Sequence, residues 1–366
     1  MTDGPTAVGT DIDDQPDPRR WVTLSILISA VMLIAIDVSV LNVAIPTILH
    51  ELHTTVPTLQ WVITGYSLTF ATFLIVGGRL GDVYGHRRMF VIGAALFGLG
   101  SLIASIAPSV GVLIFGEAIV EGLGAALLSP SSLAILSSTF RGRERATAFA
   151  VWGATIGAAV AFGPVLGGFL TTNSSWRWSF RINVVMAPIA ILGAIRLIPR
   201  SPRGARRPID FPGAALIASS MFLLVFALSE QGEYGWLRPV RSFSLGGLTV
   251  WPASRPVSVS VVAFLVAAVL IVVFVRYETV RYRRGREPLF EFAPLRLKTF
   301  RYGLVTLTIL ALGQVGMLFT LPLFLQTAEG RTAQDTGFWL LPLGLAVIAG
   351  AQIGGRLVRR VSATTV

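Results

Sequence analysis

Long apolar runs alternate with short polar or basic connections along the whole chain. Ten runs reach about 20 residues, the length that a helix needs to cross about 30 Å of hydrocarbon. In lipid every backbone polar group must be bonded within its own segment, and the alternation typical of a β-barrel is absent, so the runs predict helices. The fold class is therefore all-α, a polytopic helical membrane protein with spans at about 21–44, 57–77, 89–107, 110–136, 146–170, 179–198, 211–229, 257–275, 302–325 and 336–355.

Composition supports the membrane class and excludes several kinds of site. Hydrophobic residues make up 53% of the chain and charged residues 13%, against about 25% charged in soluble proteins. Cysteine is absent, so disulfides and thiolate chemistry are excluded, and the three histidines lie outside the apolar runs. We therefore expect no metal site and no cofactor. No nucleophile–base set or phosphate-binding loop is present, so an enzyme is not expected.

The basic residues predict the orientation of the spans. With the N-terminus in the cytoplasm, 24 of the 30 Lys and Arg fall on the cytoplasmic side. The same placement between spans argues against a nucleic-acid partner, although the net charge is +11. Residues 1–20 are read as a disordered cytoplasmic tail, and 199–210 and 276–301 as basic cytoplasmic segments. These segments either attract anionic lipids or serve only to set the topology.

A glycine- and arginine-rich loop follows the second span, with the sequence GGRLGDVYGHRR at residues 77–88. Its small residues allow close backbone approach, and Asp82 is placed to cap the third span. Such a loop either locks a conformation or is an ordinary basic turn; the candidate lock consists of Gly78, Asp82, Gly85, Arg87 and Arg88. The tetrapeptide GGRL recurs at 354–357, which indicates an internal duplication.

Three acidic residues lie inside predicted spans. Asp37 falls in the outer half of the first span, and Glu117 and Glu121 are one turn apart in the fourth. A charged acid at the bilayer centre costs at least about 2.5–3.5 kcal/mol, and such residues normally face a cavity or a partner. Two neighbouring carboxylates repel each other, which favours retention of a proton on one of them. Alternatively, Asp37 bonds only to a neighbouring helix, and Glu117 reaches the headgroups.

Five ordered motifs resemble the major facilitator superfamily, and in particular its fourteen-span drug:proton antiporters. They are GGRLGDVYGHRR, AIDVSVLNVAIP at 35–46, QWVITGYSLTFA at 60–71, FRINV at 180–184 and GATIGAAVAFGPVLGG at 153–168. The last resembles the antiporter motif of the fifth span, with Gly153, Gly157, Gly163, Pro164, Gly167 and Gly168.

The resemblance implies a particular domain order. Residues 21–198 would be a six-helix half, 211–275 an inserted two-helix hairpin, and 302–366 the start of the second half. By this count the chain holds ten of fourteen expected spans, as a fragment or a truncated protein.

The fourth span departs from the family pattern. Ala118 stands where the family has an Arg, and Glu121 stands where it has a Gln. The usual proton-transfer Arg is missing, which leaves open a carboxylate relay, another coupling ion or a more cationic substrate. Arg181 and Asn183 open the sixth span at its outer end, and Arg181 is a candidate countercharge for Glu117.

The residues and the resemblance together predict a secondary transporter of the cell membrane. It would export a small amphipathic or cationic compound in exchange for protons, as a monomer surrounded by membrane lipids. Asp37, Glu117 and Glu121 would carry coupling or substrate recognition. One alternative is an exporter of a lipid, siderophore or self-made antibiotic. Another is a truncated chain that does not transport and acts as an interaction partner.

Overall fold

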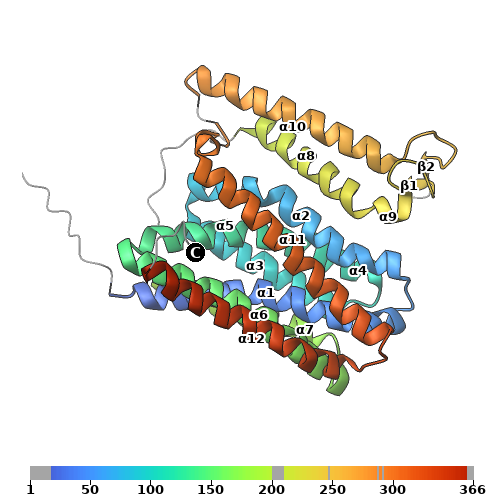
Figure 1. Cartoon of the computed structure of the whole chain (residues 1–366), viewed down its shortest axis with the longest axis horizontal. Coiled ribbons are helices and arrows are strands. Elements are labelled where there is room, and N and C mark those ends of the chain that lie inside the picture. Colours follow the sequence, from blue (N-terminus) through green and yellow to red (C-terminus); the bar gives the residue numbers. More distant parts are fainter. Residues whose placement is uncertain (1–17, 200–209, 246–247, 287, 291, 361–366) are drawn as a thin grey trace, which may run out of the picture.

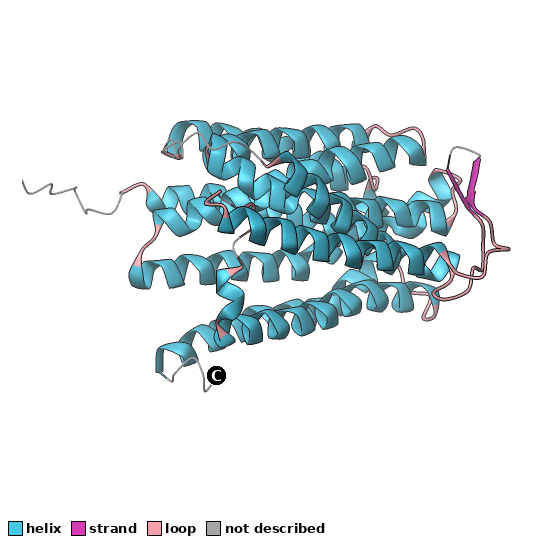
Figure 2. Cartoon of the chain, turned by 90° about the horizontal axis from the view of Figure 1, so that it is seen from above, coloured by secondary structure: helices cyan, strands magenta, loops and turns pink. Residues whose placement is uncertain are grey.

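The computed structural model describes residues 18–199, 210–245, 248–286, 288–290 and 292–360, and its helices run side by side (Figures 1 and 2). Most of the predicted tail and of the predicted linker 199–210 lies outside these residues. The first six spans are α1 Arg20–Glu51, α2 Val56–Tyr84, α3 His86–Ser105, a broken helix of α4 Val110–Ile114, η1 Phe115–Glu121 and α5 Gly122–Thr139, then α6 Gly142–Asn173 and α7 Trp178–Leu197.

The remaining elements form an edge hairpin and two further long helices. They are α8 Phe211–Ser229, α9 Gln231–Tyr234, β1 Phe243–Leu245, β2 Leu248–Trp251, α10 Val259–Arg283, the 3-10 turn η2 Ala293–Arg296, α11 Lys298–Thr327 and α12 Ala333–Arg360. The short antiparallel β1–β2 hairpin in the loop before α10 is a small departure from the all-helical prediction.

In the part of the chain that the structure describes, eight helical stretches are long and apolar enough to cross a membrane, and they coincide with the first eight predicted spans. The predicted spans at 302–325 and 336–355 fall within α11 and α12, helices of 30 and 28 residues. Several helices extend beyond the apolar runs, because a helix continues into the polar interface as long as its backbone is not interrupted. Helix α1 is the clearest case, since it continues to Glu51.

Two apolar clusters hold the first six spans together, one toward each end of the bundle. One contains Leu27, Phe90, Leu136 and Phe140, all nearly inaccessible to solvent. The other is built around Ile48, Leu113, Trp176 and Phe180. Trp176 is fully buried in it, and the side chain donates a hydrogen bond to Glu51 at 2.8 Å.

The α8–α10 pair packs on the outside of this bundle, at one edge of the molecule (Figure 1). Phe226 of α8 contacts Trp61 of α2, with ring centroids 6.5 Å apart, and joins a cluster with Ala263 of α10. Helix α12 packs along α6 on another side, whereas α11 has mostly exposed apolar side chains.

Candidate functional site

Three carboxyl groups meet inside the six-helix bundle. Asp37, Glu117 and Glu121 are 0%, 1% and 0% exposed, and one carboxyl oxygen from each lies within 4.8 Å of the others. Asp37 lies near the middle of α1, a helix that is longer than the predicted span. We call these three residues the carboxyl cluster.

A local change of helix type places the two glutamates. Glu117 is the third residue and Glu121 the last residue of η1, a seven-residue π-helical stretch between α4 and α5. Such stretches are uncommon and frequently mark functional sites. η1 is packed closely against α3, since a Cβ added to Gly100 of α3 would lie 2.6 Å from the backbone nitrogen of Glu121. The backbone that carries Glu121 is therefore pressed against α3.

Two polar side chains complete the cluster. The amide nitrogen of Asn183, in α7, donates to Asp37 at 2.7 Å and approaches Glu121 at 3.4 Å. The buried Tyr66 of α2 interacts electrostatically with all three carboxylates, and its hydroxyl has no hydrogen-bond partner among the described residues. Asn183 was an outer-side candidate from sequence, and Tyr66 was missed although it is a polar-tipped residue in mid-span.

The cluster lies between the two apolar clusters along the bundle. In α1, Asp37 falls between Leu27 of one and Ile48 of the other, and in α7 Asn183 falls between Phe180 and the buried Ala190. Apolar side chains therefore separate the carboxyl groups from both ends, which lowers the local dielectric constant and strengthens every charge interaction there.

Charge balance determines what the cluster can do. Among the described residues, no Lys or Arg is paired with any of the three carboxyl groups. One oxygen each of Asp37, Glu117 and Glu121 has no hydrogen-bond donor. Three ionised carboxylates this close would repel strongly, so protons or a cation must accompany them. The oxygen spacing is also short enough to surround one metal ion, a possibility that the sequence had not indicated.

The position of the missing arginine is filled by close helix packing. Ala118 is buried against α2, where a Cβ added to Gly65 would lie 2.8 Å from the Ala118 methyl group. A long side chain at 118 would have to displace α2. Close packing therefore leaves no room for an arginine at position 118, next to the carboxyl cluster.

The expected pairing of Arg181 with Glu117 is wrong. The Arg181 guanidinium lies over the ring of Trp178, at 5.2 Å from its centroid. Glu117 is buried deeper in the bundle, where it is within hydrogen-bonding reach of Asp37 and Glu121. Arg177, at the start of α7, forms an ion pair with Glu51 at 2.9 Å instead.

The candidate lock at 77–88 is helical rather than a loop. Helix α2 continues to Tyr84 and α3 begins at His86, so only Gly85 separates them, at φ +96°. Asp82 does not cap α3, because it lies in the last turns of α2, 3.3 Å from His86 and 3.8 Å from Arg79. The other lock residues have different surroundings. Arg87 donates to the Ile195 carbonyl of α7, whereas Arg88 is exposed. A Cβ added to Gly78 would make an ordinary contact with Pro130.

The candidate antiporter motif lies in α6, between α1 and α12. A Cβ on Gly167 would lie 2.9 Å from Val40 of α1, and a Cβ on Gly337 of α12 would lie 2.7 Å from the Pro164 carbonyl. Gly157, Gly163 and Gly168 are buried, whereas Gly153 is exposed with nothing within 4 Å of an added Cβ. Small residues therefore bring α6 close to both neighbours.

A second buried acidic group was missed from sequence. Asp210 caps α8 through the Gly213 nitrogen, accepts from Tyr277 at 2.9 Å and pairs with Arg281 at 3.3 Å. Glu278 of α10, fully buried, accepts from the backbone nitrogens of Leu289 and Phe290. These residues fasten α8, α10 and the segment after α10 to one another. We call Asp210 and Glu278 the acidic pair.

Known proteins share this arrangement of helices and motifs. The family model described as Major Facilitator Superfamily matches residues 27–366. The chain belongs to the Major Facilitator Superfamily. The all-α membrane fold is thereby confirmed. Among solved structures, a peptide transporter POT in complex with sulfate has the same fold at 16% identity, with a TM-score of 0.55 over 93% of this chain and 69% of that one.

Curated relatives confirm the resemblance to drug-efflux members of the superfamily. The chain is 33% identical over 360 residues to the probable actinorhodin transporter of Streptomyces coelicolor. It is 34% identical over 349 residues to the puromycin resistance protein pur8 of Streptomyces alboniger. The matches cover 97% and 94% of this chain but 59% and 64% of those proteins, so it spans about three fifths of their length.

Proposed function

We propose that this chain takes part in proton-coupled export of a small amphipathic or cationic compound across the cell membrane. The observation that carries the proposal is the carboxyl cluster, in which three acids share a buried space without a paired Lys or Arg among the described residues. A proton on the cluster neutralises part of its charge, and loss of that proton opens a place for a cation. Proton and substrate would then compete for the same oxygens, which couples their movements.

Membrane energetics are sufficient for such coupling. One elementary charge that crosses a membrane potential of 100 mV releases about 2.3 kcal/mol. In the superfamily architecture, halves of the bundle rock around a central site. The packing of α6 against α12 offers a small-residue contact along which α12 would slide. The N-terminus would be cytoplasmic and the protein a monomer in its lipids.

The names of the two Streptomyces relatives favour a natural-product antibiotic as substrate. One is a probable transporter of actinorhodin and the other confers resistance to puromycin. A self-made or environmental antibiotic is therefore the second candidate, with the same coupling chemistry. A lipid or siderophore has less support because neither relative is named for one.

Efflux from cells tests the proposal. Cells that express the whole gene are loaded with a fluorescent lipophilic cation, and its loss is followed with and without an uncoupler. We expect uncoupler-sensitive efflux, and Asp37→Asn and Glu121→Gln should reduce it at least about tenfold, which corresponds to about 1.4 kcal/mol. Glu233→Gln, in an exposed ion pair at the outer loop, is the matched control and should have no effect. Uncoupler-sensitive efflux that is unchanged in both cluster variants would contradict the proposal.

A further inference from the structure

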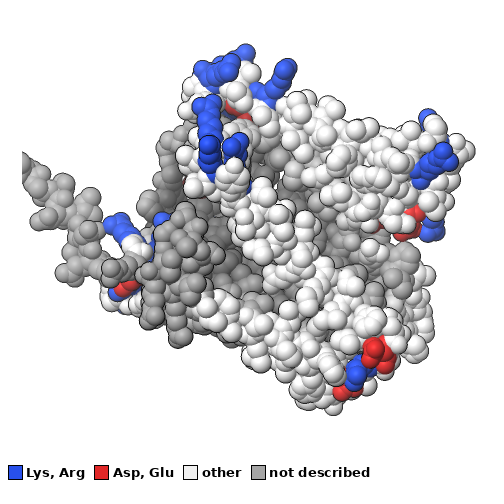
Figure 3. All heavy atoms as spheres, in the orientation of Figure 1, with Lys and Arg blue, Asp and Glu red and all other residues white. Residues whose placement is uncertain are grey.

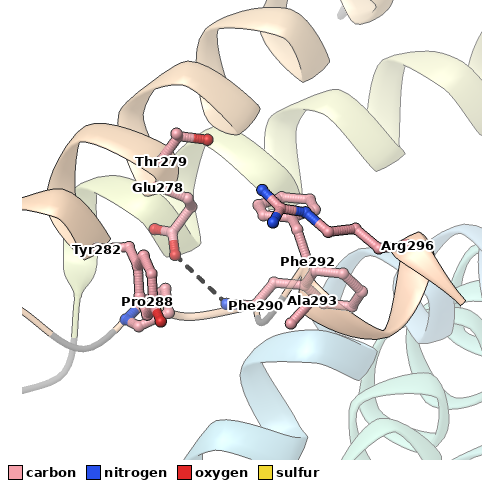
Figure 4. Close-up of a pocket in the computed structure, with 8 residues that line it drawn as sticks. All are labelled: Glu278, Thr279, Tyr282, Pro288, Phe290, Phe292, Ala293 and Arg296. Carbon is pink, nitrogen blue, oxygen red and sulfur yellow. Dashed lines mark hydrogen bonds between the residues drawn. The ribbon is translucent and has the colours of Figure 1, made fainter.

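A pocket of about 260 Å³ lies at the end of α10, between the last turns of that helix and residues 288–290 and 292–296. Figure 4 shows Arg296 on one side, Tyr282 on the other, and the rings of Phe290 and Phe292 along the segment. The pocket is separate from the carboxyl cluster and belongs to the α8–α10 edge of the molecule.

Glu278 of the acidic pair fixes one wall of this pocket. Glu278 accepts the backbone nitrogens of Leu289 and Phe290, so its charge is directed at the segment (Figure 4). Phe292 packs on Phe274 of α10, with ring centroids 6.3 Å apart, and on Phe290 at 5.0 Å. The walls are therefore built by packing and hydrogen bonds.

The surroundings of the pocket are strongly basic. Residues 276–301 contain eight Lys and Arg and three Glu, a net charge of +5. Figure 3 shows Lys and Arg side chains gathered over the end of α10 and the start of α11. An anion is therefore attracted to this end of the molecule, and Arg296 offers a guanidinium suited to a phosphate group.

The aromatic walls distinguish the ligand from a soluble anion. Tyr282 is 69% exposed and Phe290 37% exposed, at the end of a 25-residue helix that qualifies as a membrane span. Aromatic side chains at such a position lie at the level of lipid headgroups. A guanidinium next to apolar rings matches a phosphodiester that carries glycerol and acyl chains.

We propose that this pocket binds the headgroup of an anionic phospholipid from the cytoplasmic leaflet. Arg296 contacts the phosphodiester, while Tyr282, Phe290 and Phe292 contact the glycerol and the first acyl carbons. The bound lipid joins α10 to the segment that leads into α11. This site is independent of the proposed export function, since none of its residues belongs to the carboxyl cluster.

Lipid retention by the purified whole protein tests the site. The protein is exchanged into detergent with phosphatidylglycerol, phosphatidylcholine or inorganic phosphate, and retained lipid is measured by native mass spectrometry and thermal shift. We expect retention of phosphatidylglycerol over phosphatidylcholine, and Arg296→Gln should weaken it about fivefold, as one basic residue near anionic lipid contributes. Arg296→Lys, which keeps the charge, should retain most of the binding.

The matched control is Arg286→Gln. It removes the same charge from the same basic segment, but Arg286 is exposed and does not line the pocket. Equal losses in Arg286→Gln and Arg296→Gln would overturn the site in favour of diffuse attraction. Equal retention of both lipids, or no effect of Arg296→Gln, would also overturn it. Stabilisation by inorganic phosphate equal to that by phosphatidylglycerol, and dependent on Arg296, would show a soluble phosphate site instead.

Discussion

The carboxyl cluster and the acidic pair are two groups of buried acids with very different partners. The acidic pair is provided with donors: Arg281, Tyr277 and three backbone nitrogens bond to Asp210 and Glu278. The carboxyl cluster has three acids, and the Asn183 amide donates hydrogen bonds to two of them, Asp37 and Glu121. Among the described residues every one of these five acids has one oxygen without a hydrogen-bond partner, so the two regions differ in the number of donors and in the ion pair that Arg281 supplies.

The largest expected effect is a difference in stability between variants of the two regions. Asp210→Ala should lower the free energy of unfolding by about 3 kcal/mol, because it removes the buried carboxylate that accepts from Tyr277 and the Gly213 nitrogen and pairs with Arg281. Asp37→Asn should be neutral or stabilising, since it removes one of three mutually repelling acids. Thermal unfolding of the purified protein measures both. Equal destabilisation by the two variants would remove the distinction between the two regions.

A packing change should disturb the cluster without altering its chemistry. Gly100→Val places side-chain atoms where even a Cβ would lie 2.6 Å from the Glu121 nitrogen, so η1 must move. We expect a loss of about 1–3 kcal/mol in stability and a larger relative loss of efflux. Gly303→Val in α11 is the control, because nothing lies within 4 Å of its added Cβ. Full efflux in Gly100→Val would show that the position of Glu121 is not critical.

The smallest expected effect concerns the buried acid Glu230 at the C-terminal end of α8. Burial, and then the nearby Glu233 carboxylate, raise the pKa of Glu230 to about 7. The folded protein therefore keeps a proton on Glu230 between about pH 4.5 and 7 where the unfolded chain has lost it. The free energy of unfolding should therefore fall by about 1 kcal/mol over this interval and remain level above pH 7. The fall is smaller than the pKa shift alone would give, because Glu230 is partly hydrated. In Glu230→Gln the fall should be absent; its persistence would assign the dependence to another group.

The sequence predicted the spans well because the bilayer imposes a simple length and hydropathy rule on each helix separately. It also identified Asp37, Glu117 and Glu121, since acids inside apolar runs are conspicuous. That they converge could not be predicted, because spacing along one helix gives its face but not its rotation against other helices. The same gap explains the wrong Arg181 pairing.

Two further features were not predicted from the sequence, for different physical reasons. The π-helical stretch η1 carries no signal in residue spacing, since it arises where α3 packs against Gly116 and Glu121. The acidic pair was hidden in basic surroundings, although Glu278 and Asp210 each lie at the edge of an apolar run. An isolated acid next to Arg281 was the available signal.

Proton release on substrate binding tests the central claim most directly. The whole protein is purified into weakly buffered detergent with a pH indicator dye, and a lipophilic cation that it exports is added. We predict release of protons by the wild type and by Glu233→Gln, and none by Asp37→Asn or Glu121→Gln. Release of the same size in both cluster variants would contradict the claim that the buried carboxyl groups exchange a proton for the substrate.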